Sequence, residues 1–347
     1  MSLSAAAAAS AESGAVYVLT NSPAGNAVLV YDRAGDGSLT PAGSYASGGN
    51  GTGAGLGSQG AVIVSDDQRL LFAVNAGSNS VSSFRIRANG LELVDTAPSG
   101  GTMPTSLTFR HGLLYVLNAG APNNVSGFMV GPKGKIEPLF GSARPLSGAS
   151  TSPAQVEFSD DGATLIVTER ATNLIDTYAV GDDGFLTGPF VNPSAGPTPF
   201  GFAVSKRDTV LVSEAGASGG ASSYQVGQDS ALNPVSPNVM TGQLAACWAV
   251  ITRNGRYGYV ANAGTGNISG FHIDKSGSIA LLDEDGVTAV TGANPTDMAL
   301  SHDSQYLYVR VAGLSRIAIF RVRGDGSLRP LDPLTGTPAG LAGLAAF

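Results

Sequence analysis

The stretch PAQVEFSDDGATLIVTERATNLIDTYAVGDDGFLT, residues 153–187, contains four β-strand patterns in succession. It begins with a short strand entered through proline, continues with an apolar run and an alternating segment, and ends in a turn followed by a ragged last strand. Alternation of apolar and polar residues is typical of half-buried strands. The Asp-Gly pair supplies the positive φ that tight hairpins need. The stretch therefore predicts a unit of four antiparallel strands.

This unit recurs along the whole chain. Its second strand is visible as VYVLTNS, LFAVNAG, LYVLNAG, LIVTERA, VLVSEAG, GYVANAG and LYVRVAG, with the closing polar or turn residue at positions 20, 75, 118, 169, 214, 262 and 311. The six intervals between residues 20 and 311 average 48.5 residues, which lies in the range of propeller blades. We therefore predict an all-β, seven-bladed propeller with four antiparallel strands per blade and almost no helix.

The two ends of the repeat array predict how the ring closes. The second strand of the first unit, at residues 15–19, has no inner strand before it. In contrast, PAGLAGLAAF at residues 338–347 resembles the inner strands of the other units. Because an incomplete blade leaves an open sheet edge, we expect the C-terminal strand to complete blade 1. Residues 14–347 then form one domain, and residues 1–13 are a disordered leader or a cloning remnant.

Composition excludes several classes of protein. The chain of 347 residues has a net charge of −7, which argues against nucleic-acid binding, and it has no apolar run of the ~18 residues that a membrane span needs. A single cysteine, Cys247, excludes an internal disulfide and a Cys-rich zinc site. We expect no metal, no cofactor and a monomer. The location stays open: the Ala-rich start fits the remnant of an export signal, and otherwise the protein is cytoplasmic.

One glycine-rich segment matches the pattern of a cofactor-binding motif. Gly55, Gly57 and Gly60 match G-x-G-x-x-G, but they precede a strand, whereas a dinucleotide fingerprint follows a strand and opens a helix. The segment is therefore predicted to be a flexible loop.

Two phrases point to a known family. P-x-Q-V-x-F-S-x-D-G-x-x-L at residues 153–165 and NAGTGNISGFHI at residues 262–273, within seven repeats, resemble the seven-bladed lactonase propellers. This family includes bacterial 6-phosphogluconolactonases and fungal carboxymuconate-lactonising enzymes. The resemblance implies a His, two Arg and a Glu at one mouth of the channel, where the arginines hold substrate anions and the His and Glu act as acid and base.

The chain departs from that set at each position. The family's His corresponds to Ala154, and its two arginines correspond to Phe200 and Ala263. Its Glu corresponds to Ala215 in a strict alignment, with Glu214 one residue earlier. The three histidines, His111, His272 and His302, fall in turns at the opposite end of the channel or in an outer strand.

Repeat register nominates the residues that line the mouth. Glu214 is the candidate catalytic group, and the candidate ligand-binding residues are Glu169, Arg170, Gln155, Phe200, Trp248, Asn262 and Asp297. Two carboxylates in adjacent blades, Glu169 and Glu214, would bind a cation or share a proton; alternatively each accepts hydrogen bonds from loops, or Glu169 pairs with Arg170. The Asn262 position is also typical of a structural turn, and the two aromatic residues are a ligand floor or packing between blades.

Two functions remain open from the sequence. The first is a binding or scaffold module for a small molecule or a protein, with the family's catalytic residues largely replaced. The second is a lactone hydrolase or cycloisomerase with a rearranged site of carboxylates around Glu214, Glu169, Arg170 and Gln155.

Overall fold

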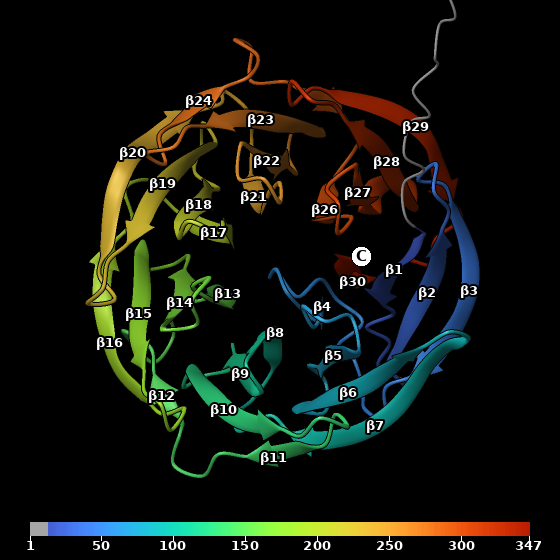
Figure 1. Cartoon of the computed structure of the whole chain (residues 1–347), viewed down its shortest axis with the longest axis vertical. Coiled ribbons are helices and arrows are strands. Elements are labelled where there is room, and N and C mark those ends of the chain that lie inside the picture. Colours follow the sequence, from blue (N-terminus) through green and yellow to red (C-terminus); the bar gives the residue numbers. More distant parts are fainter. Residues whose placement is uncertain (1–12) are drawn as a thin grey trace, which may run out of the picture.

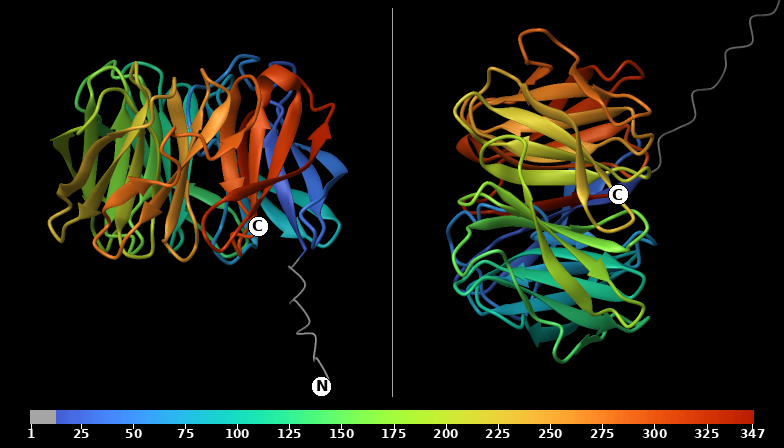
Figure 2. Two further views of the ribbon diagram at one scale, coloured as in Figure 1. Left: turned by 90° about the horizontal axis from the view of Figure 1, so that it is seen from above. Right: turned by 90° about the vertical axis from the view of Figure 1, so that its left-hand side faces the viewer.

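The chain forms a ring of seven small sheets around a central channel, as Figure 1 shows in a view down the shortest axis. The computed structural model describes residues 13–347. The predicted leader, residues 1–13, lies outside the described residues except for its last residue. Seen from the side, the ring is a thick disc (Figure 2). The prediction of a seven-bladed, all-β propeller is confirmed.

Each blade runs from an inner strand at the channel to an outer strand at the rim. Blade 1 contains β1 (Gly14–Leu19), β2 (Ala27–Arg33), β3 (Leu39–Ala46) and the C-terminal β30 (Ala342–Ala346). Blade 2 contains β4 (Val62–Val64), β5 (Leu70–Asn75), β6 (Ser80–Arg87) and β7 (Gly90–Pro98). Blade 3 contains β8 (Pro104–Arg110), β9 (Leu113–Asn118), β10 (Asn124–Val130), β11 (Ile136–Pro138) and β12 (Arg144–Pro145). Blade 4 contains β13 (Pro153–Phe158), β14 (Thr164–Glu169), β15 (Leu174–Val180) and β16 (Leu186–Pro193).

The remaining blades follow the same plan. Blade 5 contains β17 (Pro199–Val204), β18 (Thr209–Glu214), β19 (Gly220–Val226) and β20 (Leu232–Met240). Blade 6 contains β21 (Ala246–Ile251), β22 (Tyr257–Asn262), β23 (Asn267–Ile273), β24 (Ile279–Leu281) and β25 (Ala289–Val290). Blade 7 contains β26 (Pro295–Leu300), β27 (Tyr306–Val311), β28 (Arg316–Val322) and β29 (Leu328–Thr335). Within residues 13–347 the only helical element is the 3-10 turn η1 (Ala312–Leu314).

The ring closes through its C-terminal strand, as predicted. Strand β30 pairs antiparallel with β1, with Val16 opposite Ala346 and Leu19 opposite Ala342. Figure 1 places the C-terminal end beside β1 near the middle of the ring, and β30 also contacts β4 and β26 on either side. Blade 1 is thus built from strands near both ends of the described chain, and β30 covers the edge of β1 that would otherwise be unpaired.

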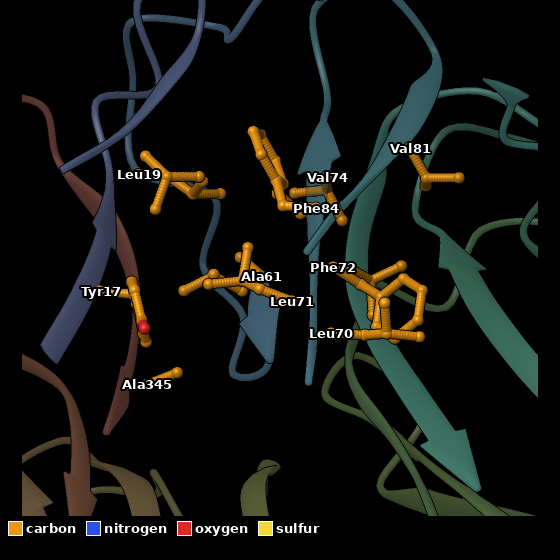
Figure 3. Packing of buried hydrophobic residues seen from close by; sticks show 14 of the residues in the cluster. Tyr17, Leu19, Ala61, Leu70, Leu71, Phe72, Val74, Val81, Phe84 and Ala345 are labelled. Atoms are coloured by element: carbon orange, nitrogen blue, oxygen red, sulfur yellow. The ribbon is translucent and has the colours of Figure 1, made fainter. Parts of the chain in front are cut away.

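Apolar side chains between neighbouring blades form the core. In Figure 3, Tyr17 and Leu19 of blade 1 face Ala61 and Leu71 of blade 2. Tyrosines of the second strands add a repeated polar contact: Tyr115, Tyr259 and Tyr308 each donate their hydroxyl to a turn carbonyl of the following blade, at 2.8 to 3.0 Å. The acceptors belong to the Asp-Gly turns, namely Gly184, Gly326 and Gly37. These turns therefore hold neighbouring blades together as well as reversing the chain.

Candidate functional site

Irregular pairing at the start of the inner strands aims side chains into the channel. The register of β13 against β14 shifts between Pro153 and Gln155, and that of β21 against β22 shifts between Ala246 and Trp248. In β26 the irregular segment extends from Pro295 to Met298. A bulge redirects the side chain that it carries. Below, the mouth is the channel end with the turns between second and third strands, and the base is the end with the turns between first and second strands.

The four positions that the resemblance assigns to the family's catalytic set lie together at the mouth. Ala154, Phe200, Ala215 and Ala263 belong to, or pack against, one apolar cluster that also contains Cys247 and Trp248. The Phe200 and Trp248 rings are 5.2 Å apart at an interplanar angle of 62°. Burial raises the pKa of the Cys247 thiol to about 12, so the thiol stays protonated and is no nucleophile at neutral pH. The mouth therefore has an apolar floor without the expected acid–base groups.

The glycine-rich segment before β4 covers this floor. We call residues Leu56–Gly60 the roof; in Figure 1 the chain before β4 reaches toward the middle of the ring. The Trp248 indole Nε1 donates to the Ser58 carbonyl at 3.0 Å. The Gln59 amide donates to the carbonyls of Phe202 (3.2 Å) and Ala249 (2.8 Å), and its oxygen accepts from the Ala249 N–H at 3.0 Å.

The roof is also fastened at other blades. The Gln59 N–H donates to the Ala154 carbonyl at 3.1 Å, and the Ser58 hydroxyl donates to the Thr105 carbonyl at 2.8 Å. The expectation of a flexible loop is therefore wrong for this part of the segment, because residue 59 alone bonds to blades 4, 5 and 6. Glycine is needed at residue 60, where φ is +80° and a Cβ would lie 3.0 Å from the Ser106 hydroxyl.

Arg170 lies at the edge of the floor. Its guanidinium carbon is 5.2 Å from the centroid of the Phe200 ring, and its Nε donates to the Ser152 carbonyl at 3.0 Å. No carboxylate of residues 13–347 lies within 4.0 Å of its nitrogens. The alternative that Glu169 pairs with Arg170 is thus wrong, and Arg170 is the one predicted ligand-binding cation that the structure brings to Phe200 and Trp248.

Glu169 points into blade 4 and away from the channel. It is fully buried and accepts hydrogen bonds from the Ser147 N–H (3.1 Å) and from the Thr172 hydroxyl (2.6 Å). Its neighbour is Asp176, which accepts from the same Ser147 N–H at 2.7 Å. Burial, followed by the nearby Glu169, raises the pKa of Asp176 to about 8. The buried carboxyl pair is therefore Glu169 with Asp176, and the predicted partner Glu214 is elsewhere.

Glu214 and Asn262 occupy the equivalent places in blades 5 and 6, and they also point into their blades. Glu214 is 1% exposed and accepts a hydrogen bond from the Ser222 hydroxyl, and burial raises the pKa of its carboxyl to about 7. The Asn262 amide donates to Asn267 Oδ1 and Ser269 Oγ, both at 2.8 Å. The prediction that these turn residues form a ring facing the mouth is wrong, because their side chains bond to the third strand of the same blade.

Gln155 joins two inner strands. Its side-chain oxygen accepts from the Phe202 N–H at 2.7 Å, and its Nε2 donates to the Phe202 carbonyl at 2.9 Å and to Glu157 Oε2 at 2.8 Å. Gln59 makes the corresponding bridge between β17 and β21. The two glutamines therefore fill the gaps that open between neighbouring inner strands of the channel.

A cavity of about 310 Å³ occupies the channel below the roof. Gln59 and Gly60 close it on the mouth side, and Gln155, Glu157 and Asp297 are among its polar lining groups. It shares residues with a wider cavity of about 730 Å³ at the base, namely Val64, Asp66, Arg110, Glu157 and Ala346. The channel is therefore closed at the mouth and open at the base.

Two carboxyl groups inside this cavity have pKa values near neutrality. Asp297 is 3% exposed and sits in the bulge of β26 at φ +58°. Its Oδ1 accepts from the Met298 N–H at 2.9 Å, and its Oδ2 is buried without a hydrogen-bond partner in residues 13–347. Burial raises the pKa of Asp297 to about 7, opposed by the Met298 backbone N–H, by Arg310 and by the Leu344 backbone N–H. Burial likewise raises the pKa of Glu157 to about 8, opposed by the Val204 backbone N–H, by the Gln155 amide and by Arg110.

Glu157 is the functional candidate that the sequence analysis missed. It lies two residues after Gln155 in β13, and side chains two residues apart point to the same face of a strand. The period of the strand was therefore the signal that places Glu157 in the channel with Gln155. The histidines follow the prediction: His302 lines the cavity at the base, His111 lies in the turn between β8 and β9, and His272 lies in β23.

Comparison with known proteins assigns the family. The model for "Lactonase, 7-bladed beta-propeller" matches residues 8–144 and 140–243. The chain belongs to this lactonase propeller family. A search of curated proteins found no significant match.

Solved structures show the same fold at low identity. The chain is similar to a periplasmic gluconolactonase of Pseudomonas aeruginosa, with 18% identity, a TM-score of 0.76, and coverage of 95% of this chain and 98% of that one. It is also similar to a protein from Lactobacillus plantarum, with 15% identity, a TM-score of 0.79, and coverage of 96% and 99%. These likenesses confirm the lactonase-type propeller fold.

Two further features bear on ligands and membranes. In the described part of the chain, no group of three or more His, Cys, Asp or Glu side chains is arranged to hold a metal ion. Among residues 13–347 there is also no helix long and apolar enough to cross a bilayer.

Proposed function

We propose that this lactonase-family propeller is a small-molecule binding module whose ligand occupies the channel cavity from the base. One observation carries the proposal: the roof is bonded over an apolar floor at the family's catalytic positions, whereas the cavity beneath it opens on the opposite face. Ala154, Phe200 and Ala263 supply no proton-transfer group to a lactone. A preformed concavity with a few polar groups remains suited to binding.

The proposal is tested by separating hydrolysis from binding. The protein is assayed on gluconolactone, 6-phosphogluconolactone and muconolactone, and a panel of small metabolites is screened by thermal shift. We expect no hydrolysis above buffer and a raised melting temperature with at least one compound. This stabilisation should be lost in Asp297→Asn, which changes the cavity, and kept in Glu284→Gln, which changes an exposed acid. Lactone turnover at an enzymatic rate, or a panel without any Asp297-dependent ligand, would overturn the proposal.

Lactone hydrolysis remains the second candidate function, favoured by the two carboxyl groups in the cavity. With pKa values of about 7 and 8, Asp297 suits a general base and Glu157 a general acid at neutral pH. The base would take a proton from water, the resulting hydroxide would add to the lactone carbonyl, and the acid would protonate the departing ring oxygen. This reading predicts turnover that Asp297→Asn and Glu157→Gln abolish and Glu214→Gln preserves; the earlier candidate site around Glu214 predicts the reverse.

A further inference from the structure

Asp297 carries an unsatisfied hydrogen-bond acceptor in the wall of the channel cavity. Its carboxyl is 3% exposed and lines the cavity, whereas Oδ2 itself is covered and has no hydrogen-bond partner within the described residues. The backbone N–H of Leu344, which also lines the cavity, acts on the same carboxyl and lowers its pKa. A buried polar group without a partner costs ~1–3 kcal/mol, and more when it is charged. The left-handed backbone at Asp297, with φ +58°, adds strain of a kind that tends to persist at functional sites. A ligand in the cavity that donates a hydrogen bond to the Asp297 carboxylate, once the side chain turns toward it, would offset this cost.

The charges of the cavity favour a cationic donor. The lining contains Asp66, Glu157 and Asp297 but only one basic side chain, Arg110. Arg110 is already paired with Asp66 at 3.6 Å and with Asp160 at 3.3 Å. Neither Glu157 nor Asp297 has a basic nitrogen within 4.0 Å among residues 13–347. The two acids therefore leave net negative charge in the cavity once they ionise.

Apart from Arg110, the basic groups that oppose this charge lie outside the cavity. Arg310, the basic residue that acts on Asp297, is not part of the lining and donates to the Thr296 hydroxyl. Lys206 and Arg253 belong to the wider cavity at the base, where both are exposed, so water and salt screen them. They weaken the attraction along the access route without neutralising the acids.

The lining also contains apolar side chains, alongside the polar Gln59, Thr108 and Gln155. The apolar lining includes Ile63 of β4, Phe109 of β8 and Met298 of β26. Glu157 belongs to blade 4 and Asp297 to blade 7, so the acids approach the cavity from well-separated parts of the ring. This combination suits a short hydrocarbon chain that carries a charged donor at one or both ends.

We propose, building on the proposed function, that the cavity binds a small aliphatic ammonium ion whose N–H groups donate to the Asp297 carboxylate and, at its other end or by a second donor, to Glu157. The apolar wall covers the hydrocarbon part. Binding of this kind requires both carboxyl groups to be ionised. The groups that act on them from the packed elements are Arg310 beside Asp297, and Arg110 and Asp66 beside Glu157.

This requirement makes binding dependent on pH. Because the carboxyl groups of the free protein have pKa values of about 7 and 8, part of them is protonated at pH 7 and must lose protons to the solvent when the ammonium binds. Affinity should therefore rise between pH 6 and pH 8.5, at which an aliphatic amine is still protonated.

The experiment compares four-carbon probes of different charge. The full-length protein is titrated calorimetrically with 1,4-diaminobutane, 1,4-butanediol and succinate at pH 6 and pH 8.5, in two buffers of different ionisation enthalpy. We expect 1,4-diaminobutane to bind at least tenfold more tightly than the diol, to release protons at pH 7, and to gain at least tenfold in affinity from pH 6 to pH 8.5. Succinate should not bind.

Variants locate the site. Asp297→Asn should lower the affinity for 1,4-diaminobutane at least tenfold, since asparagine tolerates the left-handed backbone, and Glu157→Gln should abolish part of the proton release. Glu284→Gln, an exposed acid far from the lining, should leave both unchanged. The ammonium assignment is overturned if 1,4-diaminobutane does not bind, or if Asp297→Asn leaves its affinity unchanged. Asp297-dependent binding of the diol or succinate instead overturns the ammonium class while supporting the proposed binding function.

Discussion

The residue that ends the second strand occupies the same place in each blade, and four blades show how its chemical type affects the protein. At the end of the second strand, Asn75, Asn118 and Asn262 are fully buried and donate to the third strand of their own blades. In the same place Glu214 accepts a hydrogen bond from Ser222. A carboxylate has no donor of its own when ionised, so it is a costlier occupant than asparagine. Glu214 is therefore sensitive to pH in a way that the asparagines are not.

The Glu214→Gln variant tests this difference. Burial raises the folded-state pKa of Glu214 to about 7, whereas the unfolded value is about 4.3. The carboxyl thus contributes stability that is fully present below about pH 4.3 and is lost as the pH rises through 7. We expect glutamine, which stays neutral, to favour the folded state by about 2 kcal/mol more at pH 8.5 than at pH 5, measured by urea unfolding.

A matched change separates this effect from general loss of charge. Glu137→Gln removes an exposed carboxylate that pairs with Lys135, and its effect should vary little between the two pH values. An equal free-energy change for Glu214→Gln at pH 5 and pH 8.5 would contradict the assigned pKa shift.

Among the elements, the roof decides which end of the channel is open. It is a short segment without regular secondary structure, and the backbone and side-chain hydrogen bonds of Gln59 reach three blades that lie about 100 to 190 residues further along the chain. Such contacts close the mouth because the glycines allow the chain to pass close to Ser106 and Arg170. Tertiary contacts thereby hold this glycine-rich segment in one position.

Removing the Gln59 side chain should loosen the roof. Gln59→Ala loses three side-chain hydrogen bonds, at about 1 kcal/mol each, so we expect a loss of about 1–3 kcal/mol of stability. Water should then reach Trp248, the single tryptophan of the chain, and shift its emission to the red. Amide exchange of residues 56–60 should become faster.

The control for this change is Gln228→Ala, since Gln228 is an exposed glutamine of blade 5 that makes no side-chain hydrogen bond in the described structure. It should leave the emission and the exchange of the roof unchanged. If Gln59→Ala behaves like Gln228→Ala, the roof is held by other contacts and Gln59 does not close the mouth.

For the whole molecule, the strand β30 converts an array of blades into a closed ring. It pairs with β1 and lies between the inner strands β4 and β26, which it contacts on both sides. Truncation after residue 337 would remove this strand together with Leu341 and Leu344, and would expose the side chains of Val16 and Val18 that belong to the same apolar cluster. We expect the truncated chain to lose cooperative thermal unfolding and to aggregate.

A circular permutant keeps this prediction testable. The Phe347 N–H donates to the Ala15 carbonyl at 3.1 Å, so a linker of a few residues can join residue 347 to residue 14. A chain running from residue 338 through 347 and the linker to residues 14–337 retains every strand. Its melting temperature should approach that of the natural order. A folded truncated chain, or a permutant that fails to fold although it retains β30, would contradict closure by this strand.

The sequence by itself determined the architecture, because the information for it is local and repeated seven times. Alternation in segments such as residues 153–158, Asp-Gly turns and a steady spacing predict strands and blades without knowledge of any long-range contact. The incomplete first blade and the unmatched last strand predict closure by simple counting. That Ala154, Phe200 and Ala263 stand in place of the family's catalytic residues is implied by the resemblance to the family's motifs.

Only the tertiary structure decided which side chains meet in the channel. Repeat register places Glu169, Glu214 and Asn262 at the mouth end of their strands, but it does not say which way their side chains point, and hydrogen bonds within the blades hold all three away from the channel. The roof contacts join residues about 190 positions apart, as between Gln59 and Ala249, and no local pattern encodes such a contact. Burial in the assembled ring likewise sets the pKa values of Glu157 and Asp297, because desolvation of a carboxyl depends on every blade around it.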